Sequence, residues 1–140
     1  MKYVSDSIVI SHELVLPNDI NVLGNVLGGR VMHLMDMCAA MSAYRHARKA
    51  VVTASVDQLD FLAPAKKGDI LILQSSVNYV GSTSMEVGVR IDTENAKTGD
   101  KKHTASAYLT FVSLDENGKP VKLEKINAET KDELKSLKRL

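Results

Sequence analysis

The sequence predicts an α+β protein with a single domain, in which an antiparallel sheet wraps around one long central helix. Three observations lead to this prediction. The chain has 140 residues, which is the size of one domain. One segment of about twenty residues has the composition of a buried helix, and four strand-like runs follow it. The intervals between the later runs are too short for crossover helices, which favours antiparallel pairing.

Composition narrows the possible function classes. Hydrophobic residues make up 44% and charged residues 25%, which is typical of a globular chain and excludes disorder over its whole length. A net charge of +1 and 4% aromatic residues give no reason to expect nucleic acid as a partner. The single cysteine, Cys38, excludes an intrachain disulfide. No apolar run approaches the ~20 residues that a membrane span needs, so we expect a cytoplasmic protein without membrane contact.

The first element is a predicted strand over residues 7–16. Its apolar side chains alternate with polar ones, so that one face is interrupted only by His12 and carries Ile8, Ile10, Leu14 and Leu16. This pattern predicts a half-buried strand with that face inward. The turn residues Pro17-Asn18-Asp19 end it, and residues 17–29 have the composition of a loop.

The central helix is predicted over residues 28–47. After Gly29 the segment contains neither Pro nor Gly, and it is rich in Met, Leu and Ala, which are good helix formers. Apolar residues fall on nearly every face, which indicates a buried helix. The basic residues Arg45, His46 and Arg48 suit the negative end of its dipole.

The remaining strands are predicted over residues 51–61, 69–80, 84–92 and 103–114. Gly81 marks a tight turn, and residues 94–101 and 115–118 are polar turns. We assign residues 1–123 to the domain and 124–140 to a charged tail that is helical from about residue 127. The open sheet edges favour self-association.

Asp36 is the first candidate for chemistry, because it lies in the middle of a helix that we expect to be buried. Charged side chains are rarely buried without a partner or a function. The structural alternative is that Asp36 pairs with a buried base such as His33. Its neighbours Ala39, Ala40, Ala43 and Ala47 are small, which leaves a lane for a slender ligand.

The segment from Gly24 to Gly29 is the second candidate. Backbone N–H groups at a helix start lack partners and suit a developing oxyanion. Gly28 and Gly29 let a substrate approach the backbone, and Asn25 adds an amide donor. The alternative is a plain glycine-rich loop.

Other patterns are weaker. The four His and Cys38 show no metal-ligand spacing, so no metal site is expected. Thr53, Ser55 and Asp57 are expected on one face of their strand, as the wall of a ligand site or as an exposed sheet face. Lys66, Lys67, Lys101 and Lys102 are interpreted as solvated loop charges.

Several of these motifs, in this order, resemble the hotdog-fold acyl-CoA thioesterases of the cytosolic acyl-CoA hydrolase group, which includes bacterial YciA and brain acyl-CoA hydrolase. The resemblance covers about residues 5–123. The motifs that carry it are Pro17-Asn18-Asp19, Asn21, Gly24-Asn25-Val26, Gly28-Gly29, Met35-Asp36, Arg45-His46, Val52-Thr53-Ala54-Ser55-Val56-Asp57 and Ser82-Thr83-Ser84-Met85-Glu86-Val87.

The resemblance implies hydrolysis of acyl-CoA to free CoA and a carboxylic acid, without a cofactor. It implies that Asp36 is the catalytic carboxylate, acting as general base or as nucleophile, and that Asn25 is the catalytic amide. The Gly28 and Gly29 N–H groups would then polarise the thioester carbonyl. It further implies that the substrate or CoA contacts Arg45, Thr53, Ser55, Asp57 and Ser84.

Helix geometry adds an expectation about assembly. Asp36 lies about eight residues into the helix, roughly 12 Å along its axis from Asn25. Two antiparallel helices from two protomers would bring Asn25 of one beside Asp36 of the other, so we expect a dimer with two shared sites. The resemblance extends this to a hexamer built as a trimer of dimers.

Two other functions stay open at this point. One is a non-catalytic acyl-CoA sensor or carrier, which would need neither Asp36 nor Asn25. The other is a hotdog dehydratase, which would need a His facing an acid, whereas His33 lies on the same helix as Asp36. The sequence does not indicate the acyl chain length.

Overall fold

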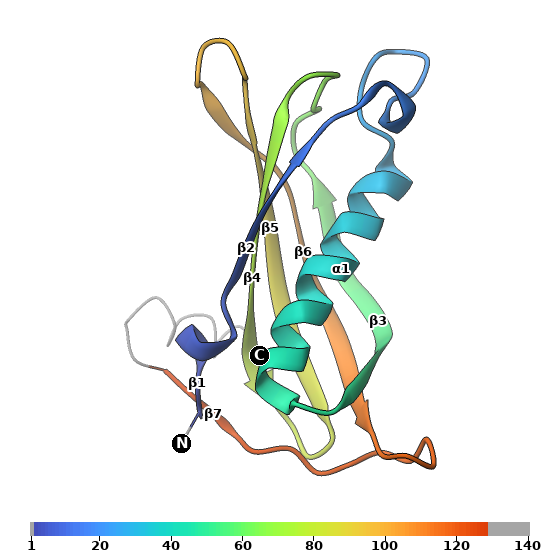
Figure 1. The fold of residues 1–140 in the computed structure, drawn as a ribbon, viewed down its shortest axis with the longest axis vertical. Coiled ribbons are helices and arrows are strands. Elements are labelled where there is room, and N and C mark those ends of the chain that lie inside the picture. The colour runs from blue at the N-terminus through green and yellow to red at the C-terminus, as the bar shows by residue number, and fades with distance from the viewer. Residues whose placement is uncertain (1, 129–140) are drawn as a thin grey trace.

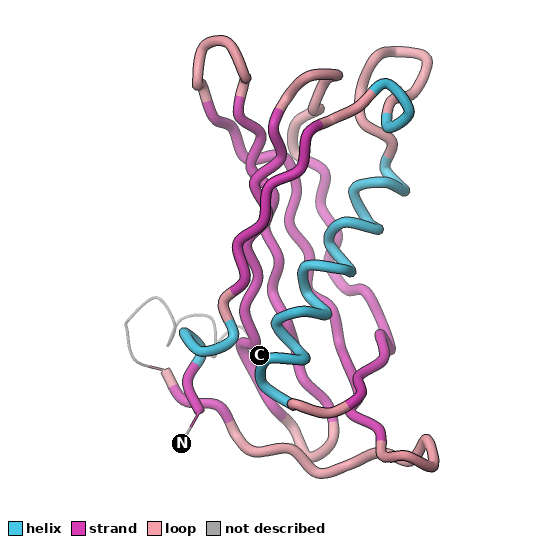
Figure 2. Tube along the Cα trace, in the orientation of Figure 1, coloured by secondary structure: helices cyan, strands magenta, loops and turns pink. Residues whose placement is uncertain are grey.

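The computed structural model describes residues 2–128. Its main elements are one long helix and a five-stranded antiparallel sheet, with the helix lying across one face of the sheet (Figure 1). The elements, in chain order, are β1 (Lys2–Tyr3), the 3-10 helix η1 (Val4–Ser7), β2 (Val9–Leu14), the 3-10 helix η2 (Pro17–Asp19), α1 (Gly28–Ala47), β3 (Ala50–Phe61), β4 (Ile70–Val80), β5 (Ser84–Glu94), β6 (Lys101–Leu114) and β7 (Ile126–Asn127). Figure 2 shows how loops join the long strands at both ends of the sheet. The predicted fold class is confirmed.

The sheet has the strand order β2-β4-β5-β6-β3, with every neighbouring pair antiparallel. β4, β5 and β6 form a meander through short connections, as predicted. β3 does not join its successor in the chain. It pairs instead with β6 at the far edge, so β2 and β3 are the two edge strands.

α1 packs on the sheet through one stripe of side chains. The buried positions recur every three or four residues, which is the helical repeat: Val31, Leu34, Met35, Cys38, Ala39, Ser42, Ala43, His46 and Ala47. They meet the alternate residues of the strands that face the helix, among them Leu73, Val87 and Leu109. Ser42 joins this contact through a 2.6 Å hydrogen bond between its Oγ and Ser75 Oγ of β4.

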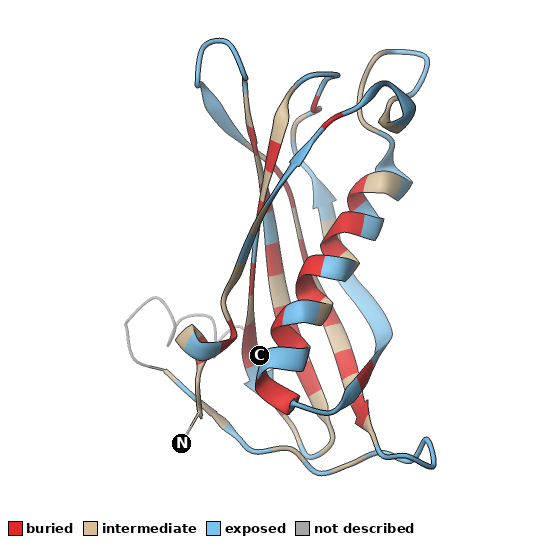
Figure 3. Ribbon diagram, in the orientation of Figure 1, coloured by how far each residue is buried: buried red, intermediate tan, exposed pale blue. Residues whose placement is uncertain are grey.

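The predicted bounds of the helix are confirmed, but its expected complete burial is wrong for a single chain. The face directed away from the sheet is exposed (Figure 3), and Met37 has 51% of its surface accessible. Met32, Met41 and Tyr44 are also exposed. The five strands cover one side of the helix only, because the sheet of one chain is too small to enclose it.

The first long strand, β2, was predicted correctly as a strand but with the wrong face inward. Ile10, Leu14 and Leu16 are exposed, with Ile10 at 58%, whereas Val9 on the opposite face packs against the core. Alternation identifies a strand but does not say which side meets the helix. At this edge the apolar face points away from α1.

The chain stays in contact with the domain as far as residue 127. β7 pairs in parallel with β1, and the Lys125 ammonium donates to the carbonyls of Val80 and Gly81 at 3.0 and 3.1 Å. Residues 124–127 therefore pack on the domain, although we placed the end of the domain at residue 123. The predicted tail helix falls mostly on residues 129–140, which lie outside the described residues.

Candidate active site

Asp36 lies where α1 crosses the edge strand β3. Thr53 of β3 donates a hydrogen bond from Oγ1 to Asp36 Oδ1 at 2.6 Å. The carboxylate is half-buried, and its predicted partner His33 is exposed on the helix. Among the described residues no hydrogen bond to Oδ2 is present, so this oxygen remains available to a water molecule or a substrate. The pair forms because β3 begins directly after α1 and turns back along it.

The start of α1 forms a second part of the candidate site. Leu27 provides no side-chain cap, and the first N–H groups of a helix lack intrahelical acceptors. A methyl group added at Gly29 would meet no atom within 4 Å, so there is open space beside the backbone here. These N–H groups can therefore donate hydrogen bonds to the carbonyl oxygen of a ligand.

A groove of about 380 Å³ adjoins this helix start. Asn25 and Gly28 line it together with the apolar side chains of Val26, Val31, Phe61, Leu62 and Pro64. Phe61 and Leu62 are 51% and 59% exposed. A mainly apolar groove with a few polar groups is the usual form of a small-molecule site.

Asn25 is held in place from two sides. Its backbone N–H donates to Asn21 Oδ1 at 3.2 Å, and its side-chain oxygen accepts from the Lys66 ammonium at 3.5 Å. Asn25 and Lys66 also form an isolated antiparallel bridge. The sequence predicts Lys66 to be a solvated loop charge. Nothing in its local pattern indicates its contact with Asn25, because that contact spans 41 residues.

The structure separates the three β3 residues that were expected on one face. A bulge lies between Thr53 and Ser55, so that Thr53 pairs with buried Phe111 and Ser55 pairs with Thr110 on the opposite face. Asp57 follows Ser55 on this opposite face and accepts from its hydroxyl at 3.4 Å. The shared-face prediction is wrong because one extra residue reverses the alternation of a strand. Only Thr53 contacts Asp36.

Arg45 and Ser84 lie away from the helix start, toward the other end of the molecule. Arg45 donates to the Ile8 carbonyl at 3.0 Å near the end of α1, and Ser84 begins β5 after the turn at Gly81. Neither contacts Asn25, Gly28 or Asp36 among the described residues. Their predicted contact with CoA stays a prediction.

His46, near the end of α1, is buried and has a shifted pKa. Burial lowers the pKa of His46 below its ordinary value of 6.5, and the nearby positive charge of Lys2 acts in the same direction. The Glu124 carbonyl, 2.6 Å from His46 Nε2, acts against this shift. This hydrogen bond between His46 and the Glu124 carbonyl holds the end of α1 against the chain segment before β7.

Metal-binding clusters and membrane-spanning helices are both absent from the described residues. No group of three or more His, Cys, Asp or Glu side chains within residues 2–128 could hold a metal ion. No helix in the described part of the chain is long and apolar enough to cross a membrane.

Comparisons with known proteins match this architecture. The model of the thioesterase superfamily matches residues 23–99, which include Asn25, both helix-start glycines, Asp36 and Thr53. An uncharacterised acyl-CoA thioester hydrolase of Bacillus subtilis, YkhA, is 41% identical over 133 residues, which cover 95% of this chain and 77% of the relative.

Solved structures agree with the sequence relatives. An apo-hexameric acyl-CoA thioesterase superposes with a TM-score of 0.94 at 42% identity, over 97% of this chain and 87% of that one. An acyl-CoA hydrolase of Staphylococcus aureus, solved with butyryl coenzyme A, coenzyme A and coenzyme A disulfide, gives a TM-score of 0.92 at 39% identity, over 98% and 84%. Structures of this enzyme also exist with an aspartate, a threonine or an asparagine changed to alanine.

The sequence relatives, the strand order of the sheet and the position of the helix therefore all identify the same protein family. The predicted resemblance, fold and enzyme class are confirmed. The chain belongs to the thioesterase superfamily and is a hotdog-fold thioesterase.

Proposed function

We propose that this protein hydrolyses acyl-CoA to free CoA and a carboxylic acid, with Asp36 as the catalytic carboxylate. The observation that carries the proposal is the hydrogen bond from Thr53 to Asp36 Oδ1 at 2.6 Å. It fixes a half-buried carboxylate at the edge of the sheet. The names of the relatives and the coenzyme A complexes of the S. aureus enzyme support the choice of substrate class.

Asp36 acts on the thioester by one of two routes. As general base it takes a proton from water while the water oxygen attacks the carbonyl carbon. As nucleophile its Oδ2 attacks that carbon to form a mixed anhydride, which water then hydrolyses. In both routes the C–S bond breaks, and the CoA thiolate leaves and takes up a proton. Water is the only co-reactant, so we propose that no cofactor takes part.

The helix start stabilises the charge that develops on the carbonyl oxygen. In the proposed site the N–H groups of Gly28 and Gly29 donate to this oxygen, and the Asn25 amide orients the thioester or the water. Preorganised donors of this kind lower the barrier without reorganising during the reaction.

The S. aureus variants add Asn21 to the candidates. In that enzyme the altered asparagine precedes the altered aspartate by 15 residues, and the threonine follows it by 17. Asn21, Asp36 and Thr53 have the same two spacings here. Asn21 accepts backbone N–H bonds from Leu23 and Asn25 through Oδ1. Asn21 thus positions the loop that presents Asn25, and its amide is a second candidate for the catalytic role.

We further propose that the site is completed between two copies of the chain. β3 is an edge strand, and its exposed residues Val56 and Phe61 lie on the face of the sheet that carries α1, beside the exposed side of the helix. Contiguous apolar surface of this kind indicates an interface. The hexameric state of one structural neighbour supports assembly of such dimers into a hexamer.

The test is release of free thiol from a panel of acyl-CoA substrates of increasing chain length. The unaltered protein should turn over at least one of them. Asp36→Asn, which keeps the shape and the Thr53 contact, should lower kcat by several orders of magnitude without changing the thermal midpoint. Saturable acyl-CoA binding without turnover of any substrate would instead identify an acyl-CoA sensor. Full activity in Asp36→Asn would remove Asp36 from the mechanism.

A further inference from the structure

A second cavity lies at the end of the sheet where α1 begins. It has a volume of about 340 Å³ and lies between the β3–β4 connection and the β5–β6 hairpin, which both project at this end (Figure 1). Three lysines line it: Lys66, Lys101 and Lys102. We call this cavity the lysine pocket.

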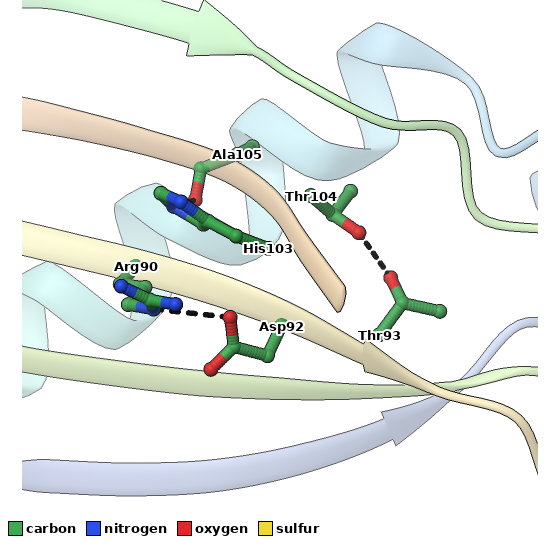
Figure 4. A network of polar contacts seen from close by, with 6 residues as sticks. All are labelled: Arg90, Asp92, Thr93, His103, Thr104 and Ala105. Carbon is green, nitrogen blue, oxygen red and sulfur yellow. Dashed lines mark hydrogen bonds and ion pairs between the residues drawn. The ribbon is translucent and has the colours of Figure 1, made fainter. Parts of the chain in front are cut away.

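The lysine pocket borders the groove that contains Asn25 and Gly28. Two contacts join their walls. Lys66 of the pocket donates to Asn25 of the groove, and Thr93 of the pocket forms a short hydrogen bond with Thr104 of the groove (Figure 4). The two cavities therefore adjoin each other along these residues.

The two cavities differ in chemistry. The groove is lined mainly by apolar side chains, whereas the lysine pocket combines three ammonium groups with the polar side chains of Thr93, Asn95 and Thr98. The apolar groove suits an acyl chain, and the lysine pocket suits the phosphates, which lie beyond the pantetheine arm at the other end of an acyl-CoA.

Two of the three lysine side chains in the pocket form no ion pair among the described residues, so their ammonium groups can bind an anionic ligand. Its two acids are Asp69 and Asp100, and Asp69 accepts the backbone N–H of Lys66 at 2.8 Å. Lys101 pairs with Glu94 at 3.7 Å. No ion pair joins Lys66 or Lys102 to a carboxylate within residues 2–128. Lys102 is the cross-strand partner of Thr93, so both side chains leave the same face of the sheet.

We propose that the lysine pocket binds the phosphate groups of CoA while the thioester lies beside the groove. This inference rests on the proposed function. Ammonium groups on flexible stems bind phosphate as point charges, and an exposed cluster also draws an anionic substrate to the site. The pocket therefore discriminates acyl-CoA from uncharged thioesters with the same acyl group.

The test compares two substrates with the same acyl chain, acyl-CoA and the uncharged acyl-N-acetylcysteamine thioester. Lys101→Gln/Lys102→Gln should raise KM for acyl-CoA about tenfold, with kcat nearly unchanged, because one or two phosphate contacts are lost. Its kcat/KM for the uncharged thioester should stay at the unaltered value. Added salt should raise KM for acyl-CoA less in this variant than in the unaltered protein.

The control is Lys119→Gln, because Lys119 lies in the turn after β6, and this turn is at the opposite end of the sheet from the β5–β6 hairpin (Figure 1). It removes one charge and should leave both substrates unaffected. Calorimetric titration with CoA gives a readout without turnover, and the double variant should bind CoA about tenfold more weakly. Unchanged KM and CoA affinity, or equal losses for both substrates, would overturn the pocket assignment. Absence of hydrolysis with intact, lysine-dependent CoA binding would instead overturn the proposed function.

Discussion

The Thr53 hydroxyl gives Asp36 a fixed position at the edge of the sheet. It occupies Oδ1, whereas no hydrogen bond to Oδ2 is present among the described residues. Thr53 lies on the helix side in the regular register of β3, and the bulge after it turns Ser55 to the opposite face. The bulge therefore selects which β3 residue contacts the carboxylate.

Thr53→Val tests this positioning role, since valine keeps the shape and removes the hydroxyl. We expect kcat to fall about 10- to 100-fold, the effect of losing one hydrogen bond to a charged group. KM and the thermal midpoint should change little. The measurement is steady-state thiol release.

Thr53→Ser is the matched control for this change. It retains the hydroxyl and should recover most of the lost kcat. Equal kcat for Thr53→Val and the unaltered protein would show that Asp36 needs no hydrogen bond from β3.

At the scale of elements, α1 is held differently at its two ends. Its start projects beside the groove, with open space at Gly29. Its end is anchored: Arg48 adopts a left-handed conformation with φ of 53°, and its N–H bonds the Tyr44 carbonyl at 2.8 Å. His46 adds the bond to Glu124. The helix thus presents its start to ligands while its end is fastened to the domain.

The anchoring by His46 predicts a pH dependence of stability. Burial lowers the pKa of His46 in the folded state, so the unfolded chain takes up the proton first as the pH falls. The contribution to stability is complete above about pH 6.5, the ordinary value, and is lost as the pH falls from there towards the folded-state value. The thermal midpoint should therefore decrease between pH 7.5 and 5.5.

His46→Gln keeps a side-chain donor for the Glu124 carbonyl but does not titrate. Its thermal midpoint should decrease less over the same interval than that of the unaltered protein. Parallel curves for the two proteins would show that His46 does not cause the pH dependence.

At the scale of the whole molecule, the half-exposed helix and the open edge of β3 show that one chain does not enclose its own candidate site. Asn25 contacts Asn21 and Lys66, and Asp36 contacts Thr53, so the two candidate catalytic groups belong to separate clusters in one chain. A second chain, antiparallel at β3, would bring opposite clusters together.

Mixing of inactive variants tests this shared arrangement. Chains with Asn25→Ala and chains with Asp36→Ala should each be inactive. After subunit exchange, half of the dimers are mixed and each mixed dimer has one intact site. About one quarter of the unaltered activity should therefore return, measured by thiol release.

Each variant exchanged with itself is the control and should remain inactive. Mass spectrometry of mixed dimers, with one chain isotope-labelled, shows that exchange has occurred. Full exchange without any return of activity would mean that each site is built within a single chain.

The sequence by itself determined the elements of this protein. The helix over residues 28–47 and the four strands after it follow from local composition and alternation, which the backbone geometry of each element imposes on its own residues. The candidate roles of Gly28 and Gly29 at the start of the helix and of Asp36 within it also come from their positions along the chain. The order of the family motifs along the chain indicates the family without any information on contacts.

Only the tertiary structure decided which residues meet. The pairing of β3 with β6, the inward face of β2, the bulge that separates Thr53 from Ser55, and the contacts of Lys66 with Asn25 and His46 with Glu124 join residues far apart in the chain or depend on a single extra residue. Local patterns describe how a segment alternates, but a long-range contact depends on the packing of the whole chain. The lysine pocket cannot be predicted from local patterns, because it forms only when separate loops fold to the same end of the sheet.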